Sequence, residues 1–231
     1  MAIEKFYALT EGTIPSPFDP SDGLAQETMN LRVVDLGTLK VSTGTVVACD
    51  PFVTLLDGPQ FSIPNGEYPV KVTIADVSQQ QDGSHQREAY LSVILGPGEA
   101  AAKEPIPALN DDDVDDNGYA YVGVDSGTIA FADAGSVKRY MPPETERDSW
   151  EDIFDSDDPN AWFTLMDSPE HYHAGIANIV LPKAENGENL ALSHSGWGDG
   201  GYPVVLTRDK DGNPIGLHID LELWAEEDDE E

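Results

Sequence analysis

Basic residues are scarce in this sequence, and their scarcity excludes several classes of protein. Lys and Arg together number 12 against 44 Asp and Glu, which gives a formal net charge of −32 over 231 residues. Binding to a phosphate backbone requires clustered cationic side chains, so we expect no direct binding to nucleic acid and none to an anionic membrane surface. An acidic field attracts cations and basic proteins instead, although it also serves solubility by itself.

Cysteine and long apolar runs are scarce as well. Cys49 is the only cysteine, so no internal disulfide bond can form, which fits a reducing compartment. Residues 1–20 lack the apolar segment and the basic start of a signal peptide. No apolar run approaches the roughly 18 residues of a membrane-spanning helix. We therefore expect a soluble, cytoplasmic protein.

Proline, glycine and acidic residues divide the chain. Several prolines interrupt a start with little periodicity, so residues 1–30 are predicted to form an extended N-terminal arm. A single β-rich domain is predicted over residues 31–224, with an acidic insertion at about 141–170. The acidic residues 225–231 are predicted to be a disordered tail.

Short alternating stretches between glycines and prolines predict strands. Tyr68, Val70, Val72 and Ile74 alternate onto one face, and similar patterns recur along the chain. The predicted strands are residues 31–34, 38–41, 45–48, 68–75, 87–95, 119–124, 128–131, 176–181, 190–194, 202–207 and 215–223.

Two short helices are predicted in the middle of the chain. Asp133 is a suitable N-cap for a helix over residues 133–140, and apolar residues spaced by three and four predict a helix over 148–154. Residues 160–166 fit either a helix or a strand, and residues 96–118 are predicted to be a loop. The predicted fold class is all-β or β-dominated α+β, an antiparallel sandwich or partly open barrel of about ten strands with one or two short inserted helices.

Four sequence blocks occur in a fixed order and together are more specific than any one of them. They read TGTVVACDP at residues 43–51, PNGEYPV at 64–70, GVDSGTIAFAD at 123–133 and SGWGDGGYPV at 195–204. In this order they resemble the bacterial family known as domain of unknown function 4241, over about residues 31–223. The resemblance implies a compact, strand-rich accessory protein and no established activity. The chain departs from the family pattern at residues 96–109, where Gly-Pro-Gly and an alanine run replace an expected tryptophan-centred segment.

Four aspartates near glycine turns are the candidates for catalysis. Asp50, Asp125, Asp133 and Asp199 lie in these blocks, and aspartates at the ends of strands could meet at one edge of a sheet. Paired carboxylates serve as general acid and base when their environments separate their pKa values, and they also bind Ca²⁺ or Mg²⁺. The pattern predicts a metal-assisted or carboxylate-based hydrolase, unless the aspartates only accept backbone hydrogen bonds in turns.

Histidines and one acidic turn are the candidates for metal binding. On a strand, His171 and His173 would point to one face and could ligate a metal, with His194 or His218 as further ligands. The alternative is an exposed polar loop. Residues 209–213 have the start of a calcium loop but lack the downstream glutamate of an EF-hand, so we expect a hairpin turn. No cofactor is predicted, and the sequence leaves open whether a divalent cation binds.

Trp197 stands among glycines and is the candidate for ligand binding. An aromatic ring in such a loop suits stacking on a small molecule, with Asp199 and Tyr202 beside it. This interpretation predicts a small-ligand-binding module. The alternative is an indole that closes one end of the sandwich.

The charge favours another function. Acidic runs over residues 111–116 and 144–158 predict a docking face for a basic protein, with association steered electrostatically. Our leading hypothesis is a non-enzymatic binding or inhibitor protein, of the immunity type, whose partner is a basic protein. The binding residues predicted in the first run are Asp111, Asp112, Asp113, Asp115 and Asp116.

Overall fold

In the part of the chain that the structure describes, the fold consists of strands and three short helices. The computed structural model describes residues 3, 5–18, 27–110, 114–143, 145–146 and 150–224. In these residues the strands are β1 (Gly12–Pro15), β2 (Thr28–Val41), β3 (Thr45–Cys49), β4 (Gln60–Ser62), β5 (Gly66–Asp76), β6 (Gln86–Ile94), β7 (Ala102–Pro105), β8 (Tyr121–Val124), β9 (Thr128–Asp133), β10 (Ile176–Val180), β11 (Asn189–His194), β12 (Gly200–Arg208) and β13 (Pro214–Asp220). The helices are α1 (Ala134–Tyr140), α2 (Trp150–Phe154) and α3 (Trp162–Asp167).

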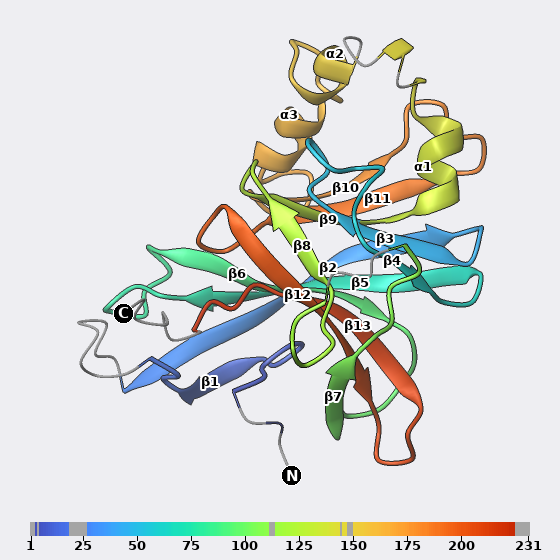
Figure 1. Ribbon diagram of the computed structural model, residues 1–231. Coiled ribbons are helices and arrows are strands. Elements are labelled where there is room, and N and C mark those ends of the chain that lie inside the picture. The colour runs from blue at the N-terminus through green and yellow to red at the C-terminus, as the bar shows by residue number, and fades with distance from the viewer. Residues whose placement is uncertain are drawn as a thin grey trace.

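The strands form two antiparallel sheets, which confirms the predicted β-dominated α+β class (Figure 1). The large sheet has the order β1-β2-β5-β6-β13-β12-β7, and β8 pairs with the first half of β12. The small sheet has the order β10-β11-β9-β3-β4. The two sheets stay separate and do not close into one barrel.

Apolar side chains fill three layers around the sheets. The core between them takes Leu91 and Ile219 from the large sheet and Phe131 from the small sheet. The outward face of the small sheet carries small residues such as Ala130, which leaves room for the helices to pack against it. The outward face of the large sheet is covered by the N-terminal segment, which contributes Phe6. Strand β9 is therefore buried on both faces, so apolar residues occupy nearly every position.

The structure corrects the loop predicted over residues 96–118. β7 lies inside this segment and pairs with β12, and β4 is a further strand that the sequence does not indicate. Both are too short for a periodic pattern to show, so pairing with a neighbour defines them. The residues left open between helix and strand form α3. The two strands predicted over residues 31–41 are one strand, irregular at Gly37, where φ is +78°.

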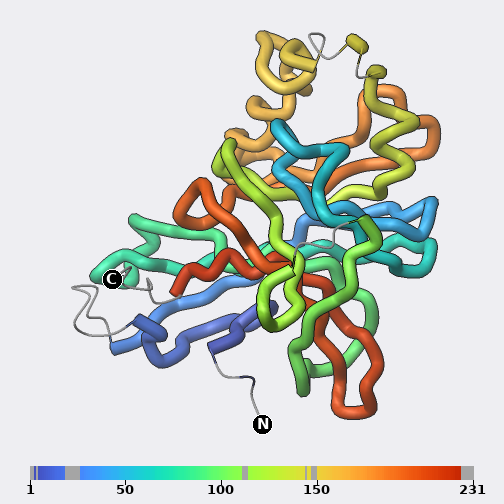
Figure 2. Tube along the Cα trace, viewed as in Figure 1, coloured from blue at the N-terminus to red at the C-terminus, as the bar shows by residue number. Residues whose placement is uncertain are grey.

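The described N-terminal segment lies against the large sheet. Within the predicted N-terminal arm, β1 pairs with the start of β2, and Figure 2 shows this blue segment beside the large sheet. Residues 225–231 and Asp111, Asp112 and Asp113 lie outside the described residues, so the predictions on them are not addressed. No helix in the described part of the chain is long and apolar enough to cross a membrane.

Candidate functional site

Two crossings of the chain between the sheets meet at one place. The β8–β9 turn, residues 125–127, leads from the large sheet to the small one, and the β11–β12 loop, residues 195–199, leads back. Asp199 in the loop accepts a hydrogen bond from the backbone N–H of Gly127, at 3.0 Å. Asp125 lies in the turn itself, with its side chain exposed. The structure thus brings two of the predicted aspartates to one crossing.

Asp50 follows the end of β3 and anchors the same turn. Its carboxylate is fully buried. Oδ1 accepts hydrogen bonds from Phe52 N at 3.0 Å, Val53 N at 3.2 Å and Ser126 Oγ at 2.7 Å. Oδ2 accepts from Asp125 N at 3.0 Å and Ser126 N at 2.8 Å. A carboxylate offers about four acceptor positions, so these donors leave none for a metal ion or a substrate.

Asp133 lies apart from the other three aspartates. It pairs with the beginning of β3, whereas Asp50 follows the end of that strand. As predicted, Asp133 is the N-cap of α1, and Oδ1 accepts a hydrogen bond from Ser136 N at 2.7 Å. Oδ2 accepts from Ser42 N at 3.0 Å and Thr43 N at 2.9 Å. Both buried aspartates therefore accept backbone hydrogen bonds, the alternative that the sequence left open.

His171 and His173 each contact a different part of the chain. His171 Nε2 lies 3.1 Å from the carbonyl oxygen of Asn178. His173 Nε2 lies 2.5 Å from Arg32 Nη2, so this nitrogen accepts a hydrogen bond from the guanidinium and its lone pair is not available to a metal. Burial and the Arg32 charge lower the pKa of His173. Among the residues that the structure describes, no group of three or more His, Cys, Asp or Glu side chains is placed to hold a metal ion.

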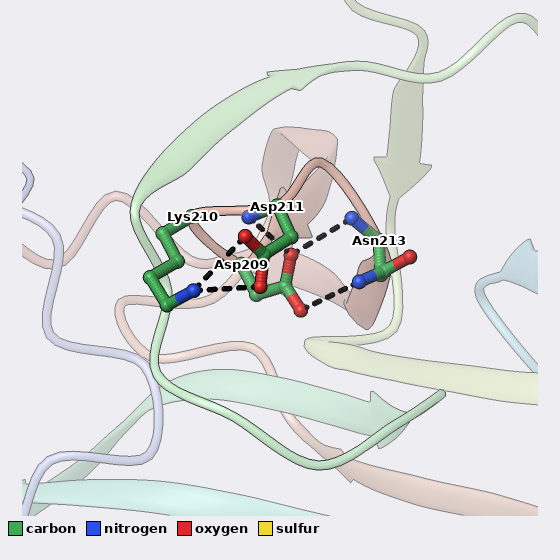
Figure 3. Close-up of polar contacts among 4 residues, drawn as sticks. All are labelled: Asp209, Lys210, Asp211 and Asn213. Atoms are coloured by element: carbon green, nitrogen blue, oxygen red, sulfur yellow. Dashed lines mark hydrogen bonds and ion pairs between the residues drawn. The ribbon is translucent and has the colours of Figure 1, made fainter.

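The calcium-like segment is a hairpin turn between β12 and β13, as predicted (Figure 3). Asp209 Oδ1 accepts hydrogen bonds from Asp211 N at 2.8 Å and Asn213 N at 2.9 Å. Asp209 Oδ2 accepts one from Asn213 Nδ2 at 2.9 Å, and these bonds, led by the Asn213 side chain, lower the pKa of Asp209. Lys210 Nζ pairs with the Asp211 carboxylate at 2.7 Å.

The first acidic run uses one of its described carboxylates internally. Asp115 Oδ1 accepts hydrogen bonds from Tyr119 N at 2.8 Å and Asn117 N at 2.9 Å, which lower the pKa of Asp115. Asp115 therefore holds its own loop in shape. Asp116 is exposed.

Trp197 is held rigidly in the β11–β12 loop while half of its surface stays accessible. The side chain is 51% exposed, and its Nε1 donates a hydrogen bond to the carbonyl oxygen of Leu223 at 2.9 Å. The Arg87 guanidinium lies 5.4 Å from the centre of the indole. Tyr202 is buried, and its hydroxyl donates to the carbonyl oxygen of Gly198 at 2.7 Å. The loop is thus fixed at both ends, with the indole presented beside a cation.

At the start of the β11–β12 loop, the structure brings together further residues that the sequence does not indicate. A Cβ on Gly175 would lie 2.9 Å from Glu88 Oε1 and 2.8 Å from His194 Nδ1, so both side chains reach this glycine. Burial raises the pKa of Glu88 to about 7, although Arg87 and Arg32 oppose the shift. Burial also lowers the pKa of His194. A glutamate near the start of a strand resembles a solvent-facing residue, so no local signal could have found this cluster.

A comparison with family models identifies the relatives of this fold. Residues 39–219 match the model described as protein of unknown function (DUF4241). The chain belongs to the DUF4241 family. The match confirms the resemblance carried by the four sequence blocks. No curated protein and no solved structure matches the chain.

The DUF4241 region contains some of the functional candidates and leaves others outside. Asp50, Asp133 and Trp197 lie within the matched residues, as does the cluster around Glu88. The N-terminal segment that covers the large sheet precedes the matched region, and Arg32 does too. The family description states no activity, so function must be argued from the residues themselves.

Proposed function

We propose that this DUF4241 protein is a non-enzymatic binding module that docks on a basic surface of a protein partner, as an immunity-type inhibitor does. The docking face is the acidic cap, defined here as residues 150–170, which includes α2 and α3. One observation carries the proposal: the cap has no Lys or Arg, and all its acidic side chains are exposed. They are Glu151, Asp152, Asp155, Asp157, Asp158, Asp167 and Glu170.

The acidic cap rests on a packed aromatic base. Phe163 stacks on Phe52 with ring centres 4.2 Å apart and planes 9° apart. Phe154 meets Phe52 edge-on at 5.1 Å. Trp162, on the buried side of the cap, is only 1% exposed. Because these contacts anchor both helices to the small sheet, the carboxylates are presented on a preorganised surface, which reduces the entropy lost on binding.

Except for Asp158, whose Oδ1 accepts hydrogen bonds from Asn160 N at 2.8 Å and Asn160 Nδ2 at 3.0 Å, the carboxylates of the cap are also free to meet a partner's cations. Among the described residues, none of them forms an ion pair within the chain. Exposed charges of one sign raise the rate of association with an oppositely charged surface more than they raise affinity. Their field extends about 8 Å at physiological ionic strength, so added salt weakens the effect.

A charge-matched pair of variants tests the proposal. The cap variant carries Glu151→Gln, Asp152→Asn, Asp155→Asn and Asp157→Asn. The control variant removes the same charge from exposed acids elsewhere, through Glu11→Gln, Asp57→Asn, Glu67→Gln and Glu99→Gln. The probe is a small basic protein of known structure, and stopped-flow fluorescence measures its association rate at low and physiological salt.

The two variants are expected to differ in rate. The cap variant should associate about tenfold more slowly than the wild-type protein at low salt, and the control variant about twofold more slowly. Equal slowing of both variants would show that the whole surface attracts the probe, and the acidic cap would then not be a docking face.

A further inference from the structure

A cavity of about 860 Å³ opens on the outward face of the large sheet. Its walls come from the N-terminal segment, the loop over residues 96–101 and the β12–β13 turn. Figure 1 shows this turn at the opposite end of the molecule from α2 and α3. The cavity is therefore independent of the acidic cap, and its volume lies within the range of about 300–1,000 Å³ that is usual for small-molecule sites.

The interior of the cavity combines apolar side chains with neutral polar groups. Phe6, Ile94 and Ile215 supply apolar surface, and Thr207 and His218 supply the polar groups. His218 Nε2 lies 2.9 Å from Thr207 Oγ1, and its Nδ1 contacts a serine hydroxyl of β6 at 2.8 Å. Burial lowers the pKa of His218 to about 3, so the imidazole is neutral at physiological pH. The interior thus suits an apolar group and offers no charge to a ligand.

The rim of the cavity is acidic. Glu99, Asp209 and Asp211 lie on it. Among the described residues, Lys210 also lines the cavity, and Lys103 Nζ lies 5.4 Å from the ring centre of Phe6. Lys210 is already paired with Asp211, and the Asp209 carboxylate accepts bonds within its own turn (Figure 3). The side chain of Glu99 is exposed at the rim and takes part in none of these bonds. This distribution repels anions and attracts a cation to the mouth of the cavity.

The N-terminal wall adopts a costly backbone conformation. Lys5 and Leu9 have φ values of +49° and +62°, a region that residues other than glycine rarely adopt. Between them, Phe6 is wedged edge-on against His218 with ring centres 5.5 Å apart. Leu9 remains 37% exposed, and its N–H is held by Thr73 Oγ1 at 2.9 Å. Strain of this kind is often retained at binding sites, and here it places two apolar side chains at the cavity.

We propose that this cavity binds a small amphipathic amine. The apolar body lies against Phe6, Ile94 and Ile215, and the ammonium group stays at the rim beside Glu99. An amphipathic carboxylate of the same shape is disfavoured, because its charge would meet the acidic rim. The site differs from the acidic cap in both place and ligand, so either proposal can fail without the other.

Three probes with the same aromatic body separate shape from charge. They are 2-phenylethylamine, 2-phenylethanol and 3-phenylpropanoate, and their binding to the full chain is measured by titration calorimetry or ligand-observed NMR. The amine is expected to bind about tenfold more tightly than the carboxylate, with the alcohol between them. Absence of amine binding, or equal binding of the carboxylate, overturns the proposal.

Variants locate the binding in the cavity. Glu99→Lys should lower the affinity for the amine about fivefold, and Glu67→Lys, at an exposed position away from the cavity, should leave it unchanged. Ala101→Trp and Ala100→Trp each place a bulky ring at the lining and should abolish binding of all three probes. Circular dichroism shows whether each variant folds. Two cavity-filling variants are used so that the test still works if one of them does not fold. Binding that survives in a folded filling variant overturns the assignment to this cavity.

Discussion

The outward faces of the two sheets are covered in different ways. On the small sheet, helices pack over small residues such as Ala130, and Trp162 closes the layer. On the large sheet, an extended N-terminal segment contributes Phe6 and leaves a cavity of about 860 Å³ beside it. An amphipathic helix covers a broad apolar stripe and turns its charges to solvent, whereas an extended segment covers a narrow strip. The first cover makes an acidic surface and the second leaves a pocket.

Removing one large side chain from each cover tests this comparison most strongly. Trp162→Ala is expected to lower the free energy of unfolding by about 3–5 kcal/mol, because it leaves a void in a closed layer. Phe6→Ala should cost only about 2 kcal/mol, since this side chain already borders open space and loses mainly its own burial. Urea denaturation of both variants measures the difference. Equal losses would show that the two covers are packed equally well.

Substitutions at Asp50 and Asp125 compare a buried and an exposed aspartate at the crossing between the sheets. Asp50→Asn should lower the free energy of unfolding by about 3 kcal/mol, because an amide group would face buried N–H donors that the carboxylate now satisfies. Asp125→Asn changes an exposed side chain and should stay within about 0.5 kcal/mol of the wild-type protein. Thermal and urea unfolding measure both effects. A neutral Asp50→Asn would mean that the carboxylate does not anchor the crossing.

Glu88 provides a pH-dependent test within the large sheet. Burial raises the pKa of Glu88 to about 7, so the folded state holds a proton that the unfolded state has already released at neutral pH. The stability that this proton contributes is fully present below about pH 4.3 and is lost as pH rises through about 7. Glu88→Gln should match the wild-type protein near pH 4 and be more stable by about 2–3 kcal/mol at pH 8.

Urea denaturation across this pH range measures the effect of Glu88→Gln, with Glu67→Gln as an exposed control. At pH 8 both carboxyl groups are ionised, so each variant loses one negative charge and the general repulsion in this acidic chain changes equally. A difference from the wild-type protein that does not vary with pH would show that the pKa of Glu88 is the same in the folded and unfolded states.

Local sequence patterns predicted most of the fold. The alternation around Val72 and the N-cap at Asp133 depend on neighbours a few residues away, so the strand and the helix could be placed from the sequence. β4 and β7 were missed because each is defined by the strand beside it. Turn chemistry was foreseen as an alternative for the aspartates, but the meeting of Asp50 with the β8–β9 turn spans 75 residues of sequence.

The candidate sites show the same division. Trp197 could be singled out because glycines surround it, and its partner Arg87 could not, because the two residues meet only through the fold. The cavity is built from three segments that are distant in the sequence; the hairpin turn at residues 209–213 could be predicted by itself, but not that it lies beside the other two.

The amino-acid sequence alone determined the strong negative charge, the strand-rich class and the family, since each follows from composition or from short ordered patterns. The tertiary structure alone decided which carboxylates are buried, which face water and where open space remains. These properties depend on distances between segments that the chain brings together only when the sheets pack, and local periodicity carries no information about those distances.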